Sequence, residues 1–280
     1  YNPRDGLVEF VTKCKERGIF VGLSTWFRHD TTRREMTVKT AEDYSRIWVE
    51  TLQLLEENDL LDTVAWVDLC NEFPFPIWCI GATETLFPEH QVKCFEDAVG
   101  VTMMVGRDGI PESSIEIINK FMSDAIAGVR SVYPQLKYTF STAEKELDLS
   151  CFDILEPHIW ADGYTEWTQE NGLFELFIPP SDNNYDQYHI ALAKRIVKCK
   201  EIYPQYKDGI FKELDRITTD VLETAKKWNL PLVTTECWST VLYEDLSLSG
   251  TTDEWDWFKE VAEEAIRLAV EKGWQGIATS

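Results

Sequence analysis

Residues 64–76 have the sequence VAWVDLCNEFPFP. The first seven are mostly apolar or β-branched, a composition that favours a buried strand. Asn71 and Glu72 follow directly, and two prolines then prevent the strand from continuing. A regular strand would point adjacent side chains to opposite faces, so an amide and a carboxylate can serve one ligand only if the strand ends or bulges there. The stretch therefore predicts a strand whose carboxyl end carries chemistry.

Helical and strand-like patterns alternate along the rest of the chain. We expect strands at residues 19–27, 64–70, 136–141, 152–160, 230–238 and 274–280. We expect helices at residues 5–18, 41–58, 112–134, 187–204, 210–229 and 254–273. Alternation of this kind, with nearly continuous apolar strands, predicts parallel strands covered by helices.

Six such strands suit either a doubly wound sheet or a (β/α)₈ TIM barrel that lacks its first two strands. The barrel is favoured here, because no strand precedes the first helix and the chain stops inside its last strand. We therefore expect a single catalytic barrel domain over residues 1–280, made of strands three to eight and truncated at both ends. Two connections, residues 73–112 and 161–186, are much longer than ordinary βα loops. Both follow strands, on the face where barrel enzymes carry their sites.

Composition narrows the classes of partner. The formal net charge of −22 disfavours binding to nucleic acid or to anionic membranes. No apolar run is long enough to span a membrane. Seven cysteines are scattered without a CxxC motif, which argues for a reducing compartment, so a cytoplasmic location is favoured, and no signal sequence is visible.

Two glutamates occupy corresponding positions. Glu72 ends the fourth strand of the expected barrel and Glu236 ends the seventh, and these strand ends would face each other in a closed barrel. Two carboxyl groups that meet in this way do not both ionise easily, so one keeps its proton and can act as an acid. Alternatively, each is an ordinary surface glutamate, and Asn71 is an ordinary turn residue.

The segments VDLCNEF (67–73) and VTTECWS (233–239) resemble the clan A glycoside hydrolases, and among them the cellulase-like, sugar-binding group that is similar to family 5. The resemblance implies retaining hydrolysis of an O-glycosidic bond by a two-glutamate double displacement, with no cofactor. It gives Glu72 the role of acid/base, Glu236 the role of nucleophile, and Asn71 a hydrogen bond to the sugar 2-hydroxyl. The substrate would be an oligosaccharide, a polysaccharide or a simpler glycoside.

His158 departs from that family's pattern, because Ile159 and Trp160 follow it where many members have His-x-Tyr. It either binds substrate or orients a carboxylate, or it is a structural histidine at a strand end. Glu156 lies two residues earlier on the same strand face and is a possible partner.

Several tryptophans fall at strand ends or in the long loops, where an indole can stack on the C–H face of a sugar or simply pack in the core. We predict substrate contacts for Trp26, Trp160 and Trp238, and we regard Trp78 and Trp167 as further candidates. A basic cluster follows the strand at 19–27 and would either meet an anionic sugar such as a uronate or pair with nearby acids; it comprises Arg28, His29, Arg33 and Arg34.

Two other functions remain open. A metal-dependent barrel isomerase or hydrolase would use acids and one histidine as ligands for Mg²⁺ or Mn²⁺, namely Glu72, Glu156, His158 and Glu236. The sequence has no HxH or DxD cluster that supports this alternative. A non-catalytic carbohydrate-binding barrel would not need both glutamates. The chain has no Gly-rich phosphate loop, which makes nucleotide binding a poor interpretation.

Overall fold

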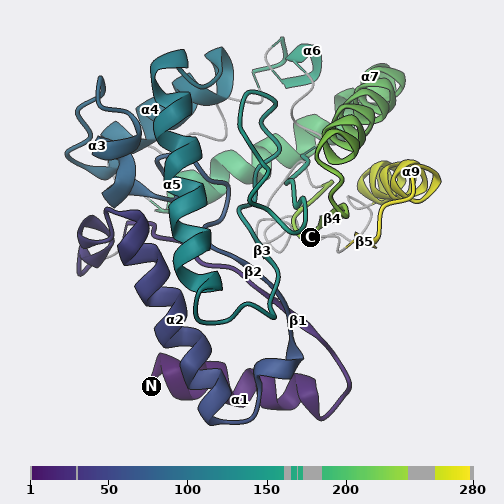
Figure 1. The fold of residues 1–280 in the computed structure, drawn as a ribbon. Coiled ribbons are helices and arrows are strands. Elements are labelled where there is room, and N and C mark those ends of the chain that lie inside the picture. The colour runs from purple at the N-terminus through teal and green to yellow at the C-terminus, as the bar shows by residue number, and fades with distance from the viewer. Residues whose placement is uncertain are drawn as a thin grey trace. The chain divides into compact units, whose positions relative to one another are not determined.

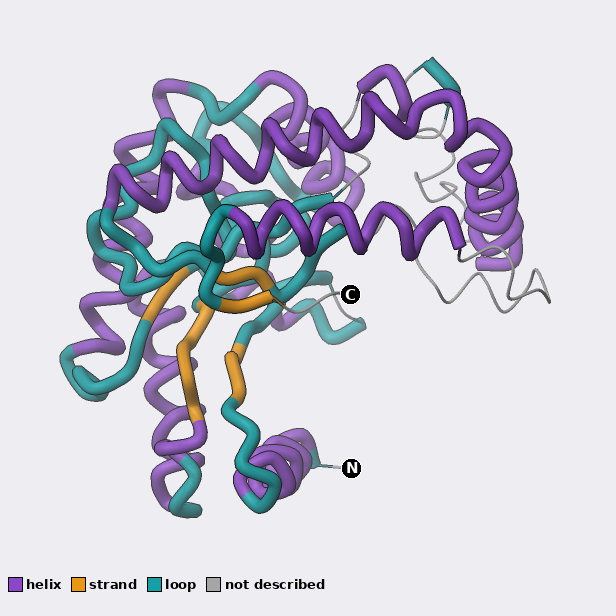
Figure 2. Tube along the Cα trace, turned by 90° about the vertical axis from the view of Figure 1, so that its right-hand side faces the viewer, coloured by secondary structure: helices purple, strands orange, loops and turns teal. Residues whose placement is uncertain are grey.

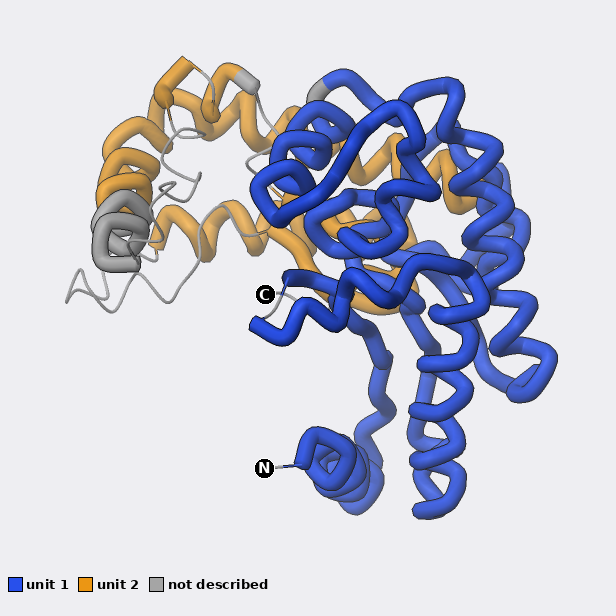
Figure 3. The backbone as a smooth tube through the Cα atoms, turned by 90° about the vertical axis from the view of Figure 1, so that its left-hand side faces the viewer, with its two compact units in different colours: residues 1–156, 227–231 blue, residues 157–226, 232–280 orange. Residues whose placement is uncertain are grey.

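The computed structural model describes residues 2–29, 31–160, 165–168, 170–172, 185–238 and 256–277. The chain forms two compact units (Figure 3). Unit 1 comprises residues 1–156 and 227–231, and unit 2 comprises residues 157–226 and 232–280. The expectation of a single catalytic domain stays a prediction.

Unit 1 contains a three-stranded parallel sheet (Figure 1). Its strands lie in the order β1 (Val21–Leu23), β2 (Val64–Asp68) and β3 (Tyr138–Thr139). The pairing of β1 with β2 is irregular at Gly22. A Cβ atom at Gly22 would lie 2.5 Å from the indole of Trp66, so this position needs glycine for close approach. The structure confirms that these three predicted strands run parallel.

The helices of unit 1 bury apolar faces with helical spacing. Helix α2 (Ala41–Glu57) begins with a capping box between Thr40 and Asp43. It packs along α5 (Glu112–Arg130) (Figure 1). Ser45 Oγ donates to the carbonyl oxygen of Ala125 at 3.0 Å. The buried side chains of α2 are Tyr44, Trp48, Leu52 and Leu55. Helix α1 (Pro3–Lys15) starts at the cap residue Asn2.

The long connection after β2 has structure of its own. It contains the 3₁₀ turn η3 (Ile80–Ala82) and helices α3 (Thr83–Leu86) and α4 (Phe95–Asp108). Shorter 3₁₀ turns lie at Arg34–Thr37 (η1) and Leu61–Thr63 (η2). Gly81 fixes the connection against η1, because a Cβ there would lie 2.1 Å from the carbonyl oxygen of Glu35.

Most described residues of unit 2 are helical, and Figure 2 shows the helices of the chain in purple. This unit pairs two short parallel strands, β4 (Val233–Thr234) and β5 (Gly276–Ile277). Its helices are α6 (Thr165–Thr168), α9 (Asp256–Glu271) and most of α7 (Tyr185–Trp228). The sequence predicted two helices, at 187–204 and 210–229, and this prediction is wrong. Pro204 lies inside the single helix α7, although an interior proline removes one backbone hydrogen bond and clashes with the preceding turn.

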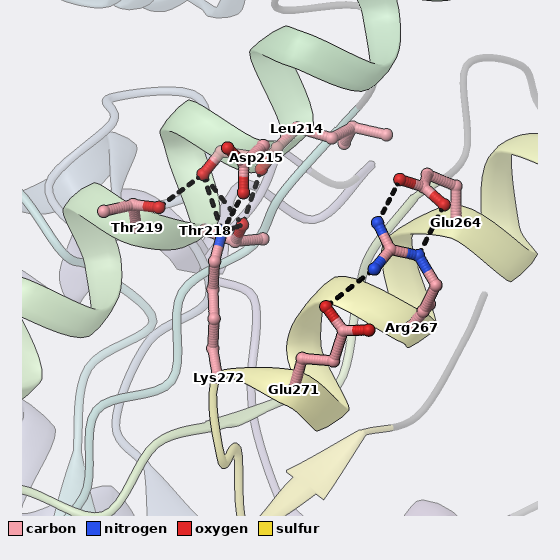
Figure 4. A network of polar contacts seen from close by, with 8 residues as sticks. All are labelled: Leu214, Asp215, Thr218, Thr219, Glu264, Arg267, Glu271 and Lys272. Atoms are coloured by element: carbon pink, nitrogen blue, oxygen red, sulfur yellow. Dashed lines mark hydrogen bonds and ion pairs between the residues drawn. The ribbon is translucent and has the colours of Figure 1, made fainter.

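Helices α7 and α9 are joined by aromatic and polar contacts. Trp167 is 0% exposed and contacts Tyr203 and Trp257, with ring centroids 6.4 and 6.1 Å away. Lys272 Nζ donates to the carbonyl oxygen of Asp215 at 2.7 Å and to Thr218 Oγ1 at 2.6 Å (Figure 4). These contacts fix the end of α9 immediately before β5.

The described residues form no closed barrel. Their strands belong to a three-stranded and a two-stranded sheet, so the α/β class is confirmed but the (β/α)₈ architecture is not. The predicted strand at 152–160 makes only scattered backbone bonds, such as Asp153 N to Tyr138 O at 2.9 Å and Ile159 N to Glu236 O at 3.3 Å. Pro157 interrupts this segment and has no N–H to donate to a ladder.

Candidate active site

The chain turns sharply at Glu72. Strand β2 ends at Asp68, and Asn71 N then donates to the carbonyl oxygen of Thr25 at 2.9 Å. Glu72 adopts a left-handed conformation with φ 44°, and its carbonyl oxygen accepts from Phe75 N at 2.9 Å. Such a backbone is unusual for a residue other than glycine and typically marks a functional or tightly held position. The strand therefore ends before the Asn-Glu pair, as the sequence required.

A buried carboxylate joins the ends of the three strands of unit 1. Asp68 is 2% exposed and accepts hydrogen bonds from the hydroxyls of Ser24 and Ser141. Ser24 follows β1 and Ser141 lies just beyond β3. Asp68 Oδ1 also accepts from Cys70 N at 3.3 Å. This arrangement satisfies a buried charge and fixes the backbone that leads into Asn71 and Glu72.

Asn71 is 1% exposed, and the turn between β2 and Glu72 places it there. Within the described part of the chain, its Nδ2 is buried and has no hydrogen-bond partner. A buried amide donor without a partner is destabilising, so native structures seldom retain one without a reason. A hydroxyl of a bound molecule would satisfy it.

The side chain of Glu72 is held by an indole from the long connection. Trp78 Nε1 donates to Glu72 Oε2. The ring of Trp26 lies 5.2 Å from that of Trp78, centroid to centroid, and Trp26 is 54% exposed. The guanidinium carbon of Arg28 lies 5.2 Å from the centroid of the Trp78 ring. Glu72 thus lies beside a platform of two indoles and one arginine.

Glu236 lies at the carboxyl end of β4 in unit 2. Its Oε2 is 3.5 Å from His158 Nδ1. The His158 side chain is 4% exposed and that of Glu236 is 32% exposed. A parallel bridge between Ile159 and Cys237 places the two segments side by side. The structure therefore pairs His158 with Glu236, which is one of the roles that the sequence predicted for it.

The remaining predicted tryptophans differ in exposure. Trp160 is partly exposed and directly follows the His158 segment. Trp238 is 1% exposed, has φ 73°, and lies 5.9 Å from Trp274, centroid to centroid. Trp167 belongs to the aromatic cluster of α7 and α9. The burial of Trp238 and Trp167 is typical of core packing.

Sequence reasoning overlooked two features of unit 1. Trp78 was considered only as a stacking surface, although its N–H contacts Glu72; the signal was its place six residues after Glu72 in the same turn. Glu144 follows β3 and is partly buried, and burial, together with the charge of Glu146, raises the pKa of its carboxyl. An acid soon after a predicted strand was the available signal for Glu144.

Unit 2 has an open cleft of about 670 Å³ between α7 and α9, lined by Tyr203, Pro204, Lys207, Asp256, Trp257, Lys259, Glu260 and Glu263. Its lining comes from helices and not from strand ends. It includes none of the residues that the sequence singled out for catalysis, and Lys207 and Glu260 in its wall form an ion pair.

The model of the sugar-binding cellulase-like family matches residues 3–280. The chain belongs to this cellulase-like family. No curated protein is similar enough to count as a match.

Two solved structures resemble the cellulase-like chain. A protein from Parabacteroides distasonis ATCC 8503, provisionally named a glycoside hydrolase, is 28% identical with a TM-score of 0.74. The match covers 98% of this chain and 66% of that one. A broad-specificity GH5-4 endoglucanase from Clostridium longisporum is 13% identical with a TM-score of 0.46, over 99% of this chain and 64% of that one. The present chain thus spans slightly less than two thirds of each neighbour.

Among the helices in the described part of the chain, none is both long and apolar enough to cross a membrane.

Proposed function

We propose that this cellulase-like protein is a retaining glycoside hydrolase that cleaves an O-glycosidic bond in a carbohydrate substrate. The end of β2 carries the proposal. There a left-handed turn presents Glu72, and the adjacent Asn71 holds a buried amide donor that lacks a partner among the described residues. A sugar hydroxyl would satisfy that donor while the glycosidic oxygen lies near the carboxyl group.

The two glutamates take different roles in this mechanism. Glu236 attacks the anomeric carbon, and a covalent glycosyl-enzyme forms as the bond to the leaving oxygen breaks. Glu72 protonates that oxygen, and in the second step it takes a proton from the water that releases the sugar. The retaining route requires the two carboxyl groups to lie roughly 5–5.5 Å apart, whereas an inverting route needs about 6.5–9.5 Å.

The surroundings of each carboxyl group support this assignment. The indole N–H of Trp78 orients Glu72 without competing for its proton, because an indole is a donor only. His158 lies beside Glu236 and stabilises the nucleophile in its ionised form whenever the ring is protonated. Asn71 would donate to the sugar 2-hydroxyl, and substrate contacts are proposed for Trp26, Trp160 and His158. The sequence also predicted a contact for Trp238, whose 1% exposure fits core packing instead.

The architecture that unites these residues is proposed to be a (β/α)₈ barrel, in which β2 and β4 are the fourth and seventh strands. Membership of the cellulase-like family and the parallel pairing within each sheet support it. In such a barrel, the carboxyl ends of all strands open onto one face, which would bring Glu72 and Glu236 to the same site.

A screen of nitrophenyl glycosides tests the proposed activity. The wild-type protein should release nitrophenol from at least one sugar, and the first sugar product should keep the anomeric configuration of the substrate in an NMR time course. Glu236→Ala should lose more than about a thousandfold in turnover, or about 4 kcal/mol of transition-state stabilisation. An inverted first product would overturn the retaining mechanism, and full activity in Glu236→Ala would overturn the assignment of the nucleophile.

A further inference from the structure

The platform beside Glu72 has an arginine that no acid neutralises among the described residues. Arg28 is exposed, and its guanidinium carbon lies 5.2 Å from the Trp78 ring and 5.8 Å from the Phe95 ring. No ion pair involving Arg28 occurs within residues 2–29 and 31–160 of unit 1. A cation–π contact uses the charge of the guanidinium but leaves its N–H donors available.

The histidine of the cluster is paired with a buried acid. Glu35 is 5% exposed, and its Oε1 lies 3.1 Å from His29 Nδ1. Arg33, the next arginine along the chain, donates to the carbonyl oxygen of Lys93 at 3.3 Å. Pairing with nearby acids was one of the two roles expected of this basic cluster, and the structure shows it for His29.

Arg28 is a cation in a chain whose formal net charge is −22. Arg28 is also preorganised, because two rings hold its head group. Trp26 is 54% exposed and lies against Trp78 on the same platform. A sugar ring could stack on Trp26 through its C–H face while a substituent reached the guanidinium.

We propose that Arg28, Trp26 and Trp78 form a subsite for a sugar that carries a carboxylate, such as a uronosyl unit. A guanidinium can bind a carboxylate through two parallel N–H···O bonds, a geometry that a neutral hydroxymethyl group cannot reproduce. The inference rests on the proposed carbohydrate-binding function and specifies its substrate class. Glu72 would act on a bond next to the acidic sugar.

Calorimetric titration with matched ligands tests this subsite. The ligands are short glucuronosyl oligosaccharides of several linkages, and each is paired with its carboxyl-reduced neutral counterpart. For at least one linkage, the wild-type protein should bind the acidic ligand roughly tenfold more tightly than the neutral one. Arg28→Gln should abolish that preference without changing the affinity for the neutral ligand. Arg28→Lys should retain only part of the preference for the acidic ligand, because an ammonium group cannot form two parallel hydrogen bonds with a carboxylate.

Arg33→Gln is the matched control, since it removes an arginine of the same cluster and should keep the preference. Thermal melts establish that each variant is folded. Equal binding of acidic and neutral ligands by wild type, no binding of either, or a preference that survives Arg28→Gln would overturn the subsite. Hydrolysis of both neutral and uronosyl nitrophenyl glycosides by the same variants separates the two proposals. If the protein prefers acidic ligands but hydrolyses no glycoside, the proposed hydrolase activity is overturned and the subsite stands. If it hydrolyses a glycoside but binds acidic and neutral ligands equally, the subsite is overturned and the hydrolase activity stands.

Discussion

Glu72 in unit 1 and Glu236 in unit 2 both come just after short parallel strands, yet their surroundings differ. Glu72 sits on a left-handed turn with φ 44°, and its carboxylate accepts from a neutral indole N–H. Glu236 lies 3.5 Å from the ring of His158, which can carry a positive charge. A neutral donor favours the ionised carboxylate only modestly, whereas a histidine cation favours it more strongly. In the proposed mechanism, Glu72 gains and loses a proton while Glu236 stays ionised.

Of the two contacts, the one between Trp78 and Glu72 should affect turnover more than the one between His158 and Glu236. Trp78→Phe keeps a ring near Trp26 and Arg28 but removes the N–H that contacts Glu72. We expect turnover to fall roughly tenfold or more, because a hydrogen bond to a charged group is worth about 1.5–3 kcal/mol. The alkaline limb of the pH–rate profile should move to higher pH, since that donor favours the ionised carboxylate. An unchanged profile would mean that Trp78 does not act through Glu72.

Changing the histidine should have a smaller effect on a different step. His158→Gln retains polarity and approximate size at a buried position. We expect a loss of less than about tenfold, because a contact of 3.5 Å contributes about 1 kcal/mol or less. The loss should persist with activated leaving groups, which still need the nucleophile. If Trp78→Phe and His158→Gln responded identically to the leaving group, the distinction between the two carboxylates would fail.

The melting temperature of the protein should depend on the charge of Glu144 in unit 1. Burial, followed by repulsion from Glu146, raises the pKa of Glu144 above its ordinary value of 4.5. Ionisation therefore favours the unfolded chain, so Glu144 lowers stability as pH rises from about 4.5 through its folded pKa, and the penalty remains at neutral pH. Glu144→Gln should raise Tm at pH 7 by about 2–4 °C, the effect of about 1 kcal/mol in a chain of this size.

That gain should vanish below the ordinary pKa of the group, where both states are protonated. Glu116→Gln, an exposed change on α5, is the control and should leave Tm within about 1 °C at every pH. A gain that was the same at pH 3 and pH 7 would show that the charge of Glu144 is not its cause.

The smallest effect is expected from a chelator. If both glutamates act as acid/base and nucleophile, EDTA should leave turnover unchanged, because the mechanism uses no metal ion. A loss of activity that Mg²⁺ or Mn²⁺ restored would favour the metal-dependent alternative and remove the contrast between Glu72 and Glu236.

The sequence predicted well those features that depend on local pattern. The turn at Asn71 and Glu72 followed from the two prolines, and the parallel pairing of β1, β2 and β3 followed from alternation with helices. It failed where tertiary packing outweighs local preference. Pro204 is tolerated inside α7, and Pro157 breaks the ladder of an otherwise apolar segment. Contacts between distant side chains, such as Arg28 with Phe95, have no local pattern to reveal them.

The leaving-group dependence of Glu72→Ala tests the central claim most directly. A glycoside with a very good leaving group, such as a dinitrophenolate, needs no proton in the first step. Glu72→Ala should therefore cleave it at nearly the wild-type rate until the glycosyl-enzyme accumulates. Azide should then rescue the second step, because a small anion fits the space left by the carboxyl group and needs no general base. Glu236→Ala should be inactive on the same substrates, with or without azide. If Glu72→Ala is equally inactive on every leaving group and azide restores nothing, Glu72 is not the acid/base.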